Sequence, residues 1–244
     1  MKGSVIPRYS GLPTVLKENG YYNLFFMTHE GQYDNMNAFF RTNGYDEVFS
    51  QENYPADKVV NSFGVQDDFL YDYAIPVLNQ RAATGQPFFA TLLSISNHPP
   101  YVIPPFFHPK TSEPETQIVE YADWALRQFF EEARKQPWFD NTIFVLEGDH
   151  GKLVGDAECE LPESYNHIPL MIYSSRIQPE EKTAFGGQVD IQPTILGLLN
   201  IDYLQNNFGV DLLKEERPCM FYTADNMVVG RNDTSVSYTH LTLP

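Results

Sequence analysis

A long apolar run, PFFATLLSIS at residues 87–96, constrains the fold more than any other feature of the chain. It shows no polar alternation, and strands buried on both faces have this composition. A second apolar run, Thr142–Leu146, is followed closely by Gly148-Asp149-His150-Gly151. The two runs predict a central sheet, with an Asp-His pair on a glycine-flanked turn at the carboxyl end of one strand.

Segments of strand and helix character alternate along the chain. Strands are expected at 21–28, 45–49, 87–96, 142–146 and 168–173, and helices at 12–19, 35–42, 69–83, 117–135 and 190–199. The stretch 50–61 is expected to be an irregular loop, and Pro76 must bend the helix 69–83 or lie near its start. This order predicts an α/β fold with a mostly parallel central sheet and helices on both faces.

Composition and charge exclude several classes of function. The 244 residues are 42% hydrophobic, enough for a sizeable core, and carry 16 Lys and Arg against 32 Asp and Glu, a formal net charge of −16. Nucleic-acid binding needs a basic surface, so we expect no nucleic-acid partner. Two cysteines, Cys159 and Cys219, form no CxxC pair, which argues against a zinc ribbon or a redox motif.

Three histidines follow predicted strands: His29, His98 and His150. Parallel strands would bring them to one edge of the sheet, where ligand sites form in open α/β folds. One histidine after a strand is more often a packed or surface residue, but three in this position, one beside Asp149, favour a site. His167 precedes a strand, so it is expected at the opposite edge with a structural role.

Asp149 and His150 have the chemistry of a divalent-metal site. The alternative is a polar turn with an Asp cap. Asp67 and Asp68 are interpreted as the start of a helix rather than as metal ligands.

Several segments resemble the lipoteichoic acid synthase family, within the sulfatase and alkaline phosphatase superfamily. The resemblance covers roughly residues 10 to 200, in order. Its segments are the block from Gly20-Tyr21 to Gly44-Tyr45, SNHPPY at 96–101, TIFVLEGDHG at 142–151, HIPL at 167–170 and VDIQPT at 189–194.

The resemblance implies roles for the candidate residues. Asp149 and His150 would hold the catalytic divalent ion, Mn²⁺ in these synthases, with Ca²⁺, Mg²⁺ and Zn²⁺ as alternatives. His98 would hold the substrate phosphate or assist the leaving group, and His29 would be a second substrate contact. The partners would be a phospholipid head-group donor and a glycan or lipid acceptor. The complete protein would be membrane-anchored, with an extracytoplasmic catalytic domain.

The chain departs from the family in one respect. Family members attack with a Thr placed before the Gly20-Tyr21 block, and an acidic metal ligand precedes that Thr. Neither is recognisable here, and Thr14, inside a predicted helix, is not assigned the role. We therefore expect the chain to begin within a longer gene and to be inactive by itself. If a further metal ligand exists, His29, Glu30, Asp34 and His167 are the first candidates.

The last nine residues, VSYTHLTLP at 236–244, resemble a translated sequencing adaptor. We therefore expect residues 1–235 to be a partial sulfatase-like catalytic domain and exclude His240 as a ligand; the alternative is a genuine tail.

Three functions stay open at this point. The first is a phosphoglycerol transferase that works through a covalent phospho-Thr intermediate. The second is a sulfatase or phosphatase of the same superfamily. The third is a non-catalytic binding module with a degenerate site.

Overall fold

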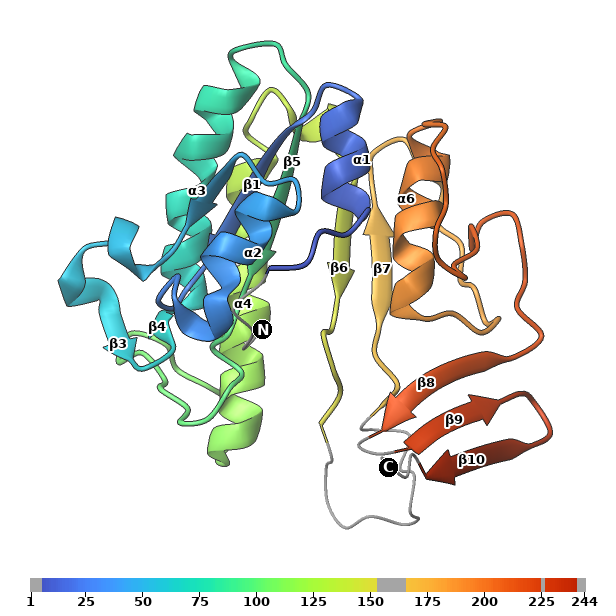
Figure 1. The fold of residues 1–244 in the computed structure, drawn as a ribbon. Helices are drawn as coiled ribbons and strands as arrows, with labels where there is room; N and C mark the ends of the chain where they lie inside the picture. Colours follow the sequence, from blue (N-terminus) through green and yellow to red (C-terminus); the bar gives the residue numbers. More distant parts are fainter. Residues whose placement is uncertain (1–5, 153–165, 225–226, 241–244) are drawn as a thin grey trace. The chain divides into compact units, whose positions relative to one another are not determined.

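The computed structural model describes residues 6–152, 166–224 and 227–240 (Figure 1). The chain divides into two compact units, Met1–Phe139 and Asp140–Pro244, and each is described by itself. Cys159 lies outside the described residues.

The first unit is built on a parallel sheet of three strands, in the order β2-β1-β5. These are β1 (Tyr22–Met27), β2 (Glu47–Phe49) and β5 (Phe88–Leu93). Strand β1 lies in the middle, and all of its residues after Tyr22 are buried. It pairs with β5 over its whole length, from Tyr22 opposite Phe88 to Met27 opposite Leu93. The predicted parallel sheet is therefore confirmed in this unit.

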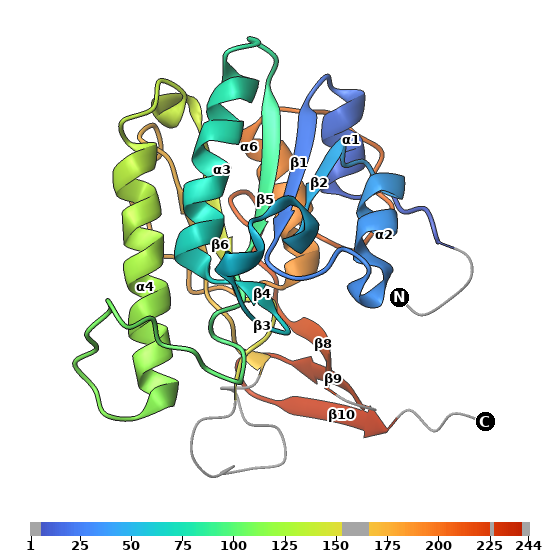
Figure 2. The ribbon, with the colours of Figure 1, turned by 90° about the vertical axis from the view of Figure 1, so that its left-hand side faces the viewer.

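Helices cover both faces of this sheet (Figure 2). Helices α1 (Leu12–Glu18) and α2 (Met36–Thr42) pack on one face, and α3 (Asp67–Ala82) packs on the other. Helix α4 (Pro114–Ala133) packs against α3. Successive side chains of a strand point to opposite faces. Accordingly, Phe25 stacks on Phe40 of α2, with ring centroids 3.8 Å apart, and Phe26 stacks on Phe49 at 4.8 Å.

A small hairpin forms within the region expected to be irregular. Strands β3 (Val59–Asn61) and β4 (Gly64–Val65) pair in antiparallel fashion beside the end of β1. Gly64 has φ +89°, and a Cβ atom there would lie 1.8 Å from the Thr28 carbonyl oxygen. Only glycine permits this approach, in which Val65 N–H donates to the Thr28 oxygen at 3.2 Å.

The structure also contains short 3₁₀ turns: η1 (Tyr33–Asn35), η2 (Gln51–Asn53), η3 (Ala56–Lys58), η4 (Phe139–Asn141) and η5 (Gln188–Asp190).

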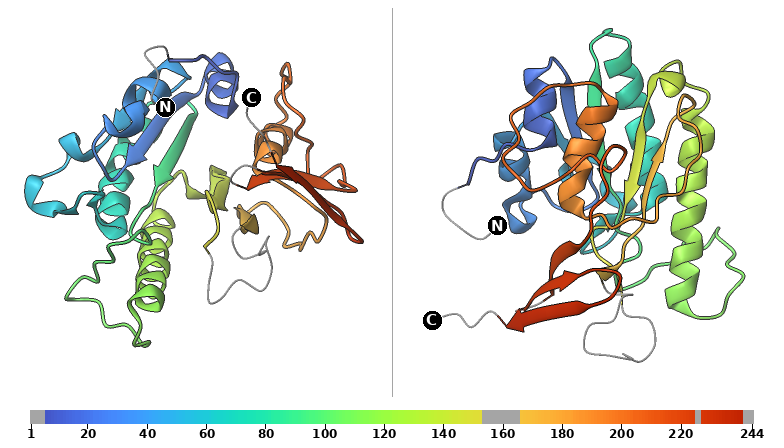
Figure 3. Two further views of the ribbon diagram at one scale, coloured as in Figure 1. Left: turned by 60° about the horizontal axis from the view of Figure 1, so that its bottom comes forward. Right: turned by 90° about the vertical axis from the view of Figure 1, so that its right-hand side faces the viewer.

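The second unit contains antiparallel sheets. Strand β6 (Phe144–Glu147) pairs with β7 (Leu170–Tyr173), with Glu147 opposite Leu170. Three further strands form the sheet drawn in red in Figure 3: β8 (Met220–Ala224), β9 (Met227–Arg231) and β10 (Val236–His240). The start of the expected adaptor-derived tail thus lies in β10. The mostly parallel order that the sequence predicts is found in the central sheet of the first unit, whereas the strands described in the second unit pair antiparallel.

A buried ion pair organises the second unit around α6 (Ile191–Leu198). Asp190 is fully buried, and its carboxylate accepts hydrogen bonds from Arg217 Nε at 2.9 Å and from the backbone N–H of Gly187 and Val210 at 2.8 Å. The sequence predicts Asp190 as a cap of α6. Its carboxylate instead bonds the preceding turn and the segment 210–217, because these donors lie within its reach.

No helix in the described ranges combines the length and the apolar composition needed to cross a bilayer.

The buried Tyr45 predicts a loss of stability at alkaline pH. Burial raises the pKa of its phenol to about 12, and its hydroxyl lies 2.7 Å from Thr91 Oγ1. The unfolded phenol has a pKa near 10. The folded state therefore keeps a proton that the unfolded state loses, so this contribution is complete below pH ~10 and disappears as pH rises towards about 12.

We expect Tyr45→Phe to cost about 1 kcal/mol at neutral pH, through loss of the hydrogen bond. The variant should also lose less stability between pH ~10 and ~12 than the parent, because it lacks this titration. Urea unfolding across this pH range measures both effects. Tyr9→Phe, at an exposed position, is the control and should match the parent. If Tyr45→Phe lost as much stability as the parent between pH ~10 and ~12, Tyr45 would not be the titrating group.

Candidate functional site

His29 lies two residues beyond β1 and is packed inside the first unit. It is 3% exposed, its Nδ1 lies 3.0 Å from the Glu30 carbonyl oxygen, and its ring centroid lies 5.0 Å from that of Tyr33. Tyr33 is exposed, and Asp34 and Asn35 after it have φ values of +45° and +62°. Such conformations are uncommon outside glycine and indicate a tightly constrained loop. The substrate contact assigned to His29 stays a prediction.

His98 lies five residues beyond β5 and is exposed. Its Nδ1 lies 2.7 Å from the Pro99 carbonyl oxygen. Because a carbonyl oxygen only accepts hydrogen bonds, Nδ1 must carry the proton and donate it. The other ring nitrogen, Nε2, is then the one available to a ligand. Because β1 and β5 pair in parallel, His29 and His98 follow the same edge of one sheet, as the sequence predicts.

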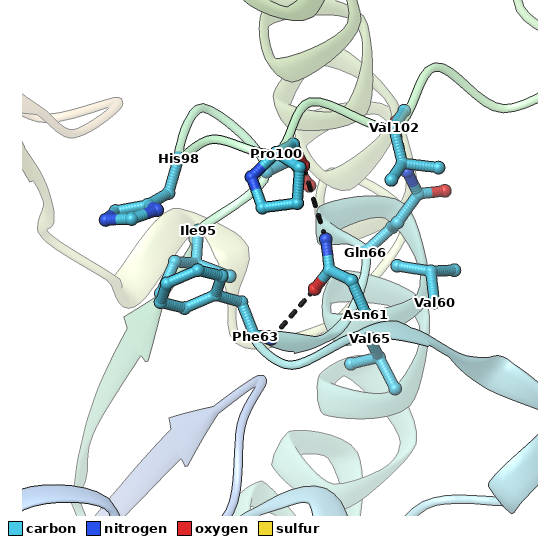
Figure 4. Close-up of a pocket in the computed structure, with 10 residues that line it drawn as sticks. Val60, Asn61, Phe63, Val65, Gln66, Ile95, His98, Pro100 and Val102 are labelled. Carbon is cyan, nitrogen blue, oxygen red and sulfur yellow. Dashed lines mark hydrogen bonds between the residues drawn. The ribbon is translucent and has the colours of Figure 1, made fainter.

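The hairpin β3–β4 packs against the segment that carries His98 (Figure 4). The rings of Phe63 and His98 have centroids 4.1 Å apart. Asn61 accepts from the Phe63 N–H at 2.8 Å and donates to the Pro100 carbonyl oxygen at 3.4 Å. The cavity that these residues line holds about 10 Å³, roughly the space of one water molecule. It is too small for a sugar or a glycerol phosphate.

Asp149 and His150 follow β6 in the second unit, and both side chains are exposed to solvent, at 77% and 68%. The His150 N–H donates to Asp149 Oδ1 at 2.9 Å, and His150 Nδ1 lies 2.8 Å from the Gly151 carbonyl oxygen. These bonds leave His150 Nε2 and Asp149 Oδ2, which lie 3.7 Å apart, with no partner other than each other among the residues that the structure describes.

The separation of these two atoms is compatible with one shared divalent ion. Metal–ligand distances near 2.1 Å allow two donors up to about 4 Å apart to share an ion. Within the described ranges, no group of three or more His, Cys, Asp or Glu side chains is placed to hold a metal. The pair therefore supplies two ligands, and the metal site stays a prediction.

The expectation for His167 was wrong in one respect. His167 precedes β7, and β7 runs antiparallel to β6 rather than parallel. The start of β7 therefore lies beside the end of β6, on the edge that carries Asp149 and His150. His167 is exposed there.

Gln188 is a site residue that the sequence analysis did not identify. Its Nε2 donates to the Asp149 carbonyl oxygen at 2.8 Å and to the Gly148 carbonyl oxygen at 3.3 Å. It thereby holds the backbone of the turn that carries Asp149 and His150. The only signal in the sequence is its place just before the VDIQPT segment, because a long-range side-chain contact leaves no periodic pattern.

Comparisons with known proteins identify the family of the chain. The Sulfatase family model matches residues 3–201. Lipoteichoic acid synthase 1 of Bacillus subtilis is 27% identical over an aligned length of 252 positions, and the alignment covers 94% of this chain and 38% of that protein.

Two solved structures are also similar. A protein of the alkaline phosphatase superfamily from Vibrio parahaemolyticus is 30% identical, with a TM-score of 0.85, over 94% of this chain and 57% of that chain. The lipoteichoic acid synthase LtaP from Listeria monocytogenes is 24% identical and shares the fold, with a TM-score of 0.77, over 94% of this chain and 65% of that chain.

The chain spans little more than a third of the length of the curated relatives that it matches. The family match covers residues 3–201 and includes the strand ends that carry His29, His98, Asp149 and His150. The chain belongs to the Sulfatase family, a family of enzymes in the alkaline phosphatase superfamily.

Proposed function

We propose that the chain is part of a metal-dependent phosphoglycerol or phosphoalcohol transferase of the lipoteichoic acid synthase type. The observation that supports it most is the Asp149-His150 turn at the end of β6, where His150 Nε2 and Asp149 Oδ2 lie 3.7 Å apart. The similarity to lipoteichoic acid synthases over 94% of the chain supports the transferase over other activities of the family.

Each residue has a defined part in this proposal. Asp149 and His150 hold a divalent ion, with Mn²⁺ our first choice and Ca²⁺, Mg²⁺ or Zn²⁺ as alternatives. When bound, such an ion neutralises charge on a phosphate oxygen and lowers the pKa of a coordinated hydroxyl. The exposed His98 offers Nε2 to the phosphate or to the leaving group, because the Pro99 carbonyl engages Nδ1. His29 needs its loop to open before it can contact substrate, because it is 3% exposed.

The substrates follow from the same proposal. The donor would be a phospholipid head group and the acceptor a glycan or lipid, handled by a membrane-anchored protein whose catalytic domain is extracytoplasmic. We assign the nucleophile to no residue of this chain. The chain has a formal net charge of −16, which repels a phosphate ligand. A bound phosphate would therefore need its charge neutralised locally, by a metal or a histidine.

Two other functions compete with this one. The Sulfatase family match equally favours hydrolysis of sulfate or phosphate esters. No group of three or more His, Cys, Asp or Glu side chains in the described ranges is placed to hold a metal, which favours a binding module with a degenerate site.

We expect the isolated chain to show no turnover, because no Thr in its sequence is recognisable as the nucleophile. The purified protein would be incubated with Mn²⁺ and, in parallel, a fluorescent phosphatidylglycerol, p-nitrophenyl phosphate and p-nitrophenyl sulfate. Turnover of the lipid that is lost on adding EDTA would reveal a nucleophile in the chain. Turnover of the sulfate ester alone would support the sulfatase alternative.

Metal binding should depend on the two exposed ligands. We expect weak Mn²⁺ binding by the parent and at least about a tenfold loss of affinity in Asp149→Asn and in His150→Gln, because each removes one of two donors. Electron paramagnetic resonance of free Mn²⁺ measures the affinity. Asp202→Asn, an exposed carboxylate on another segment, is the matched control. Equal affinity in all four proteins would exclude this metal site.

Gln188→Ala should weaken Mn²⁺ binding about tenfold without unfolding the unit, because Gln188 holds the backbone of the ligand turn rather than the ion. Gln192→Ala is the control, since the Gln192 side chain contacts Asn207 instead. The same titration measures both variants. An affinity that falls equally in both would show a general effect on the fold.

A further inference from the structure

Asp67 is a buried carboxylate in the first unit with no part in the proposed chemistry. It is the first residue of α3 and is 2% exposed. Its Oδ1 accepts hydrogen bonds from the backbone N–H of Ile95 at 2.9 Å and of Ser96 at 3.0 Å. Its own N–H donates to Ser96 Oγ at 3.0 Å. Three hydrogen bonds thus join Asp67 to the segment directly after β5.

This segment carries His98. The His98 N–H donates to the Ile95 carbonyl oxygen at 2.9 Å, which closes a turn over 95–98. The Asp67 carboxylate binds the N–H groups at the first two positions of that turn. On the other side, the His98 ring rests against Phe63, four residues before Asp67 (Figure 4). The segment 63–67 therefore contacts both the backbone of the turn and the imidazole.

A role as a helix cap does not account for Asp67. Its carboxylate bonds Ile95 and Ser96, outside α3, whereas the neighbouring Asp68 accepts from the Phe69 N–H within the helix and from the Tyr121 hydroxyl. Burial raises the pKa of the Asp67 carboxyl, and the nearby Asp68 charge adds to this effect, while the hydrogen bonds from Ile95 and Ser96 oppose it. A buried carboxylate is costly unless it is well bonded. The interpretation of both aspartates as the start of a helix is therefore incomplete for Asp67.

We propose that Asp67 is a positioning residue for His98, which fixes the turn 95–98 so that the imidazole lies against Phe63 with Nε2 free. This inference rests on the proposed function, in which His98 contacts the substrate phosphate. A carboxylate suits the task because one oxygen can accept from two consecutive backbone N–H groups.

The test uses nuclear magnetic resonance on the labelled chain. In the parent, a cross-peak is expected between the ring protons of Phe63 and the imidazole protons of His98. Asp67→Ala should remove this cross-peak and speed amide exchange of Ile95 and Ser96 about tenfold, because both N–H groups lose their acceptor. Asp67→Asn, whose amide oxygen can accept the same hydrogen bonds, should keep the cross-peak and the slow amide exchange of the parent. Asp68→Ala is the matched control and should keep them.

The outcomes are separable. An unchanged cross-peak and unchanged exchange in Asp67→Ala would overturn the inference. If Asp67→Ala does not fold, Asp67→Ser takes its place, because the serine hydroxyl ends one bond short of the carboxylate oxygens that accept from Ile95 and Ser96. A weaker cross-peak in Asp67→Ser supports the inference, and an unchanged one overturns it.

A titration with glycerol phosphate tests the underlying function. The His98 signals should shift in the parent and in Asp67→Asn, and should shift less in Asp67→Ala. If His98 does not respond even in the parent, its proposed phosphate contact is wrong, while the positioning role is still decided by the cross-peak.

Discussion

The parallel pairing of β1 with β5 is the constraint on which the first unit depends. It runs from Tyr22 opposite Phe88 to Met27 opposite Leu93 and places β1 in the middle of the sheet. Burial of β1 on both faces then requires helices on both sides, which α2 and α3 supply. Paired parallel strands have their carboxyl ends at the same edge of the sheet. The segments that carry His29 and His98, which follow β1 and β5, therefore begin at the same edge.

Buried carboxylates organise the loops of both units. In the first unit, Asp67 binds the backbone of the segment that carries His98. In the second unit, Asp190 binds Arg217 and the backbone of Val210, which ties the start of α6 to a distant segment. Loops have few apolar contacts of their own, so a well-bonded buried charge can specify one conformation where packing cannot.

Much of the fold was predictable because it is local. The helix expected at 12–19 is α1, Leu12–Glu18, and the strand expected at 21–28 is β1, Tyr22–Met27. Apolar period and breaker residues lie within each such segment, so the sequence contains the whole signal. The strand-end placement of His98 and of Asp149-His150 follows from the same reasoning. The hairpin at 59–65 was missed, because its close approach at Gly64 depends on the backbone of Thr28.

The sequence by itself determined the α/β class, the family and the Asp-His turn, because apolar runs and motif residues are contiguous in the chain. Only the tertiary structure decided the antiparallel pairing of β6 with β7, which moves His167 to the edge of Asp149. It also decided the burial of His29 and the contacts of Gln188 and Asp67. Strand direction and long-range hydrogen bonds depend on the tertiary contacts between segments that are distant in the sequence, and no local sequence pattern specifies these contacts.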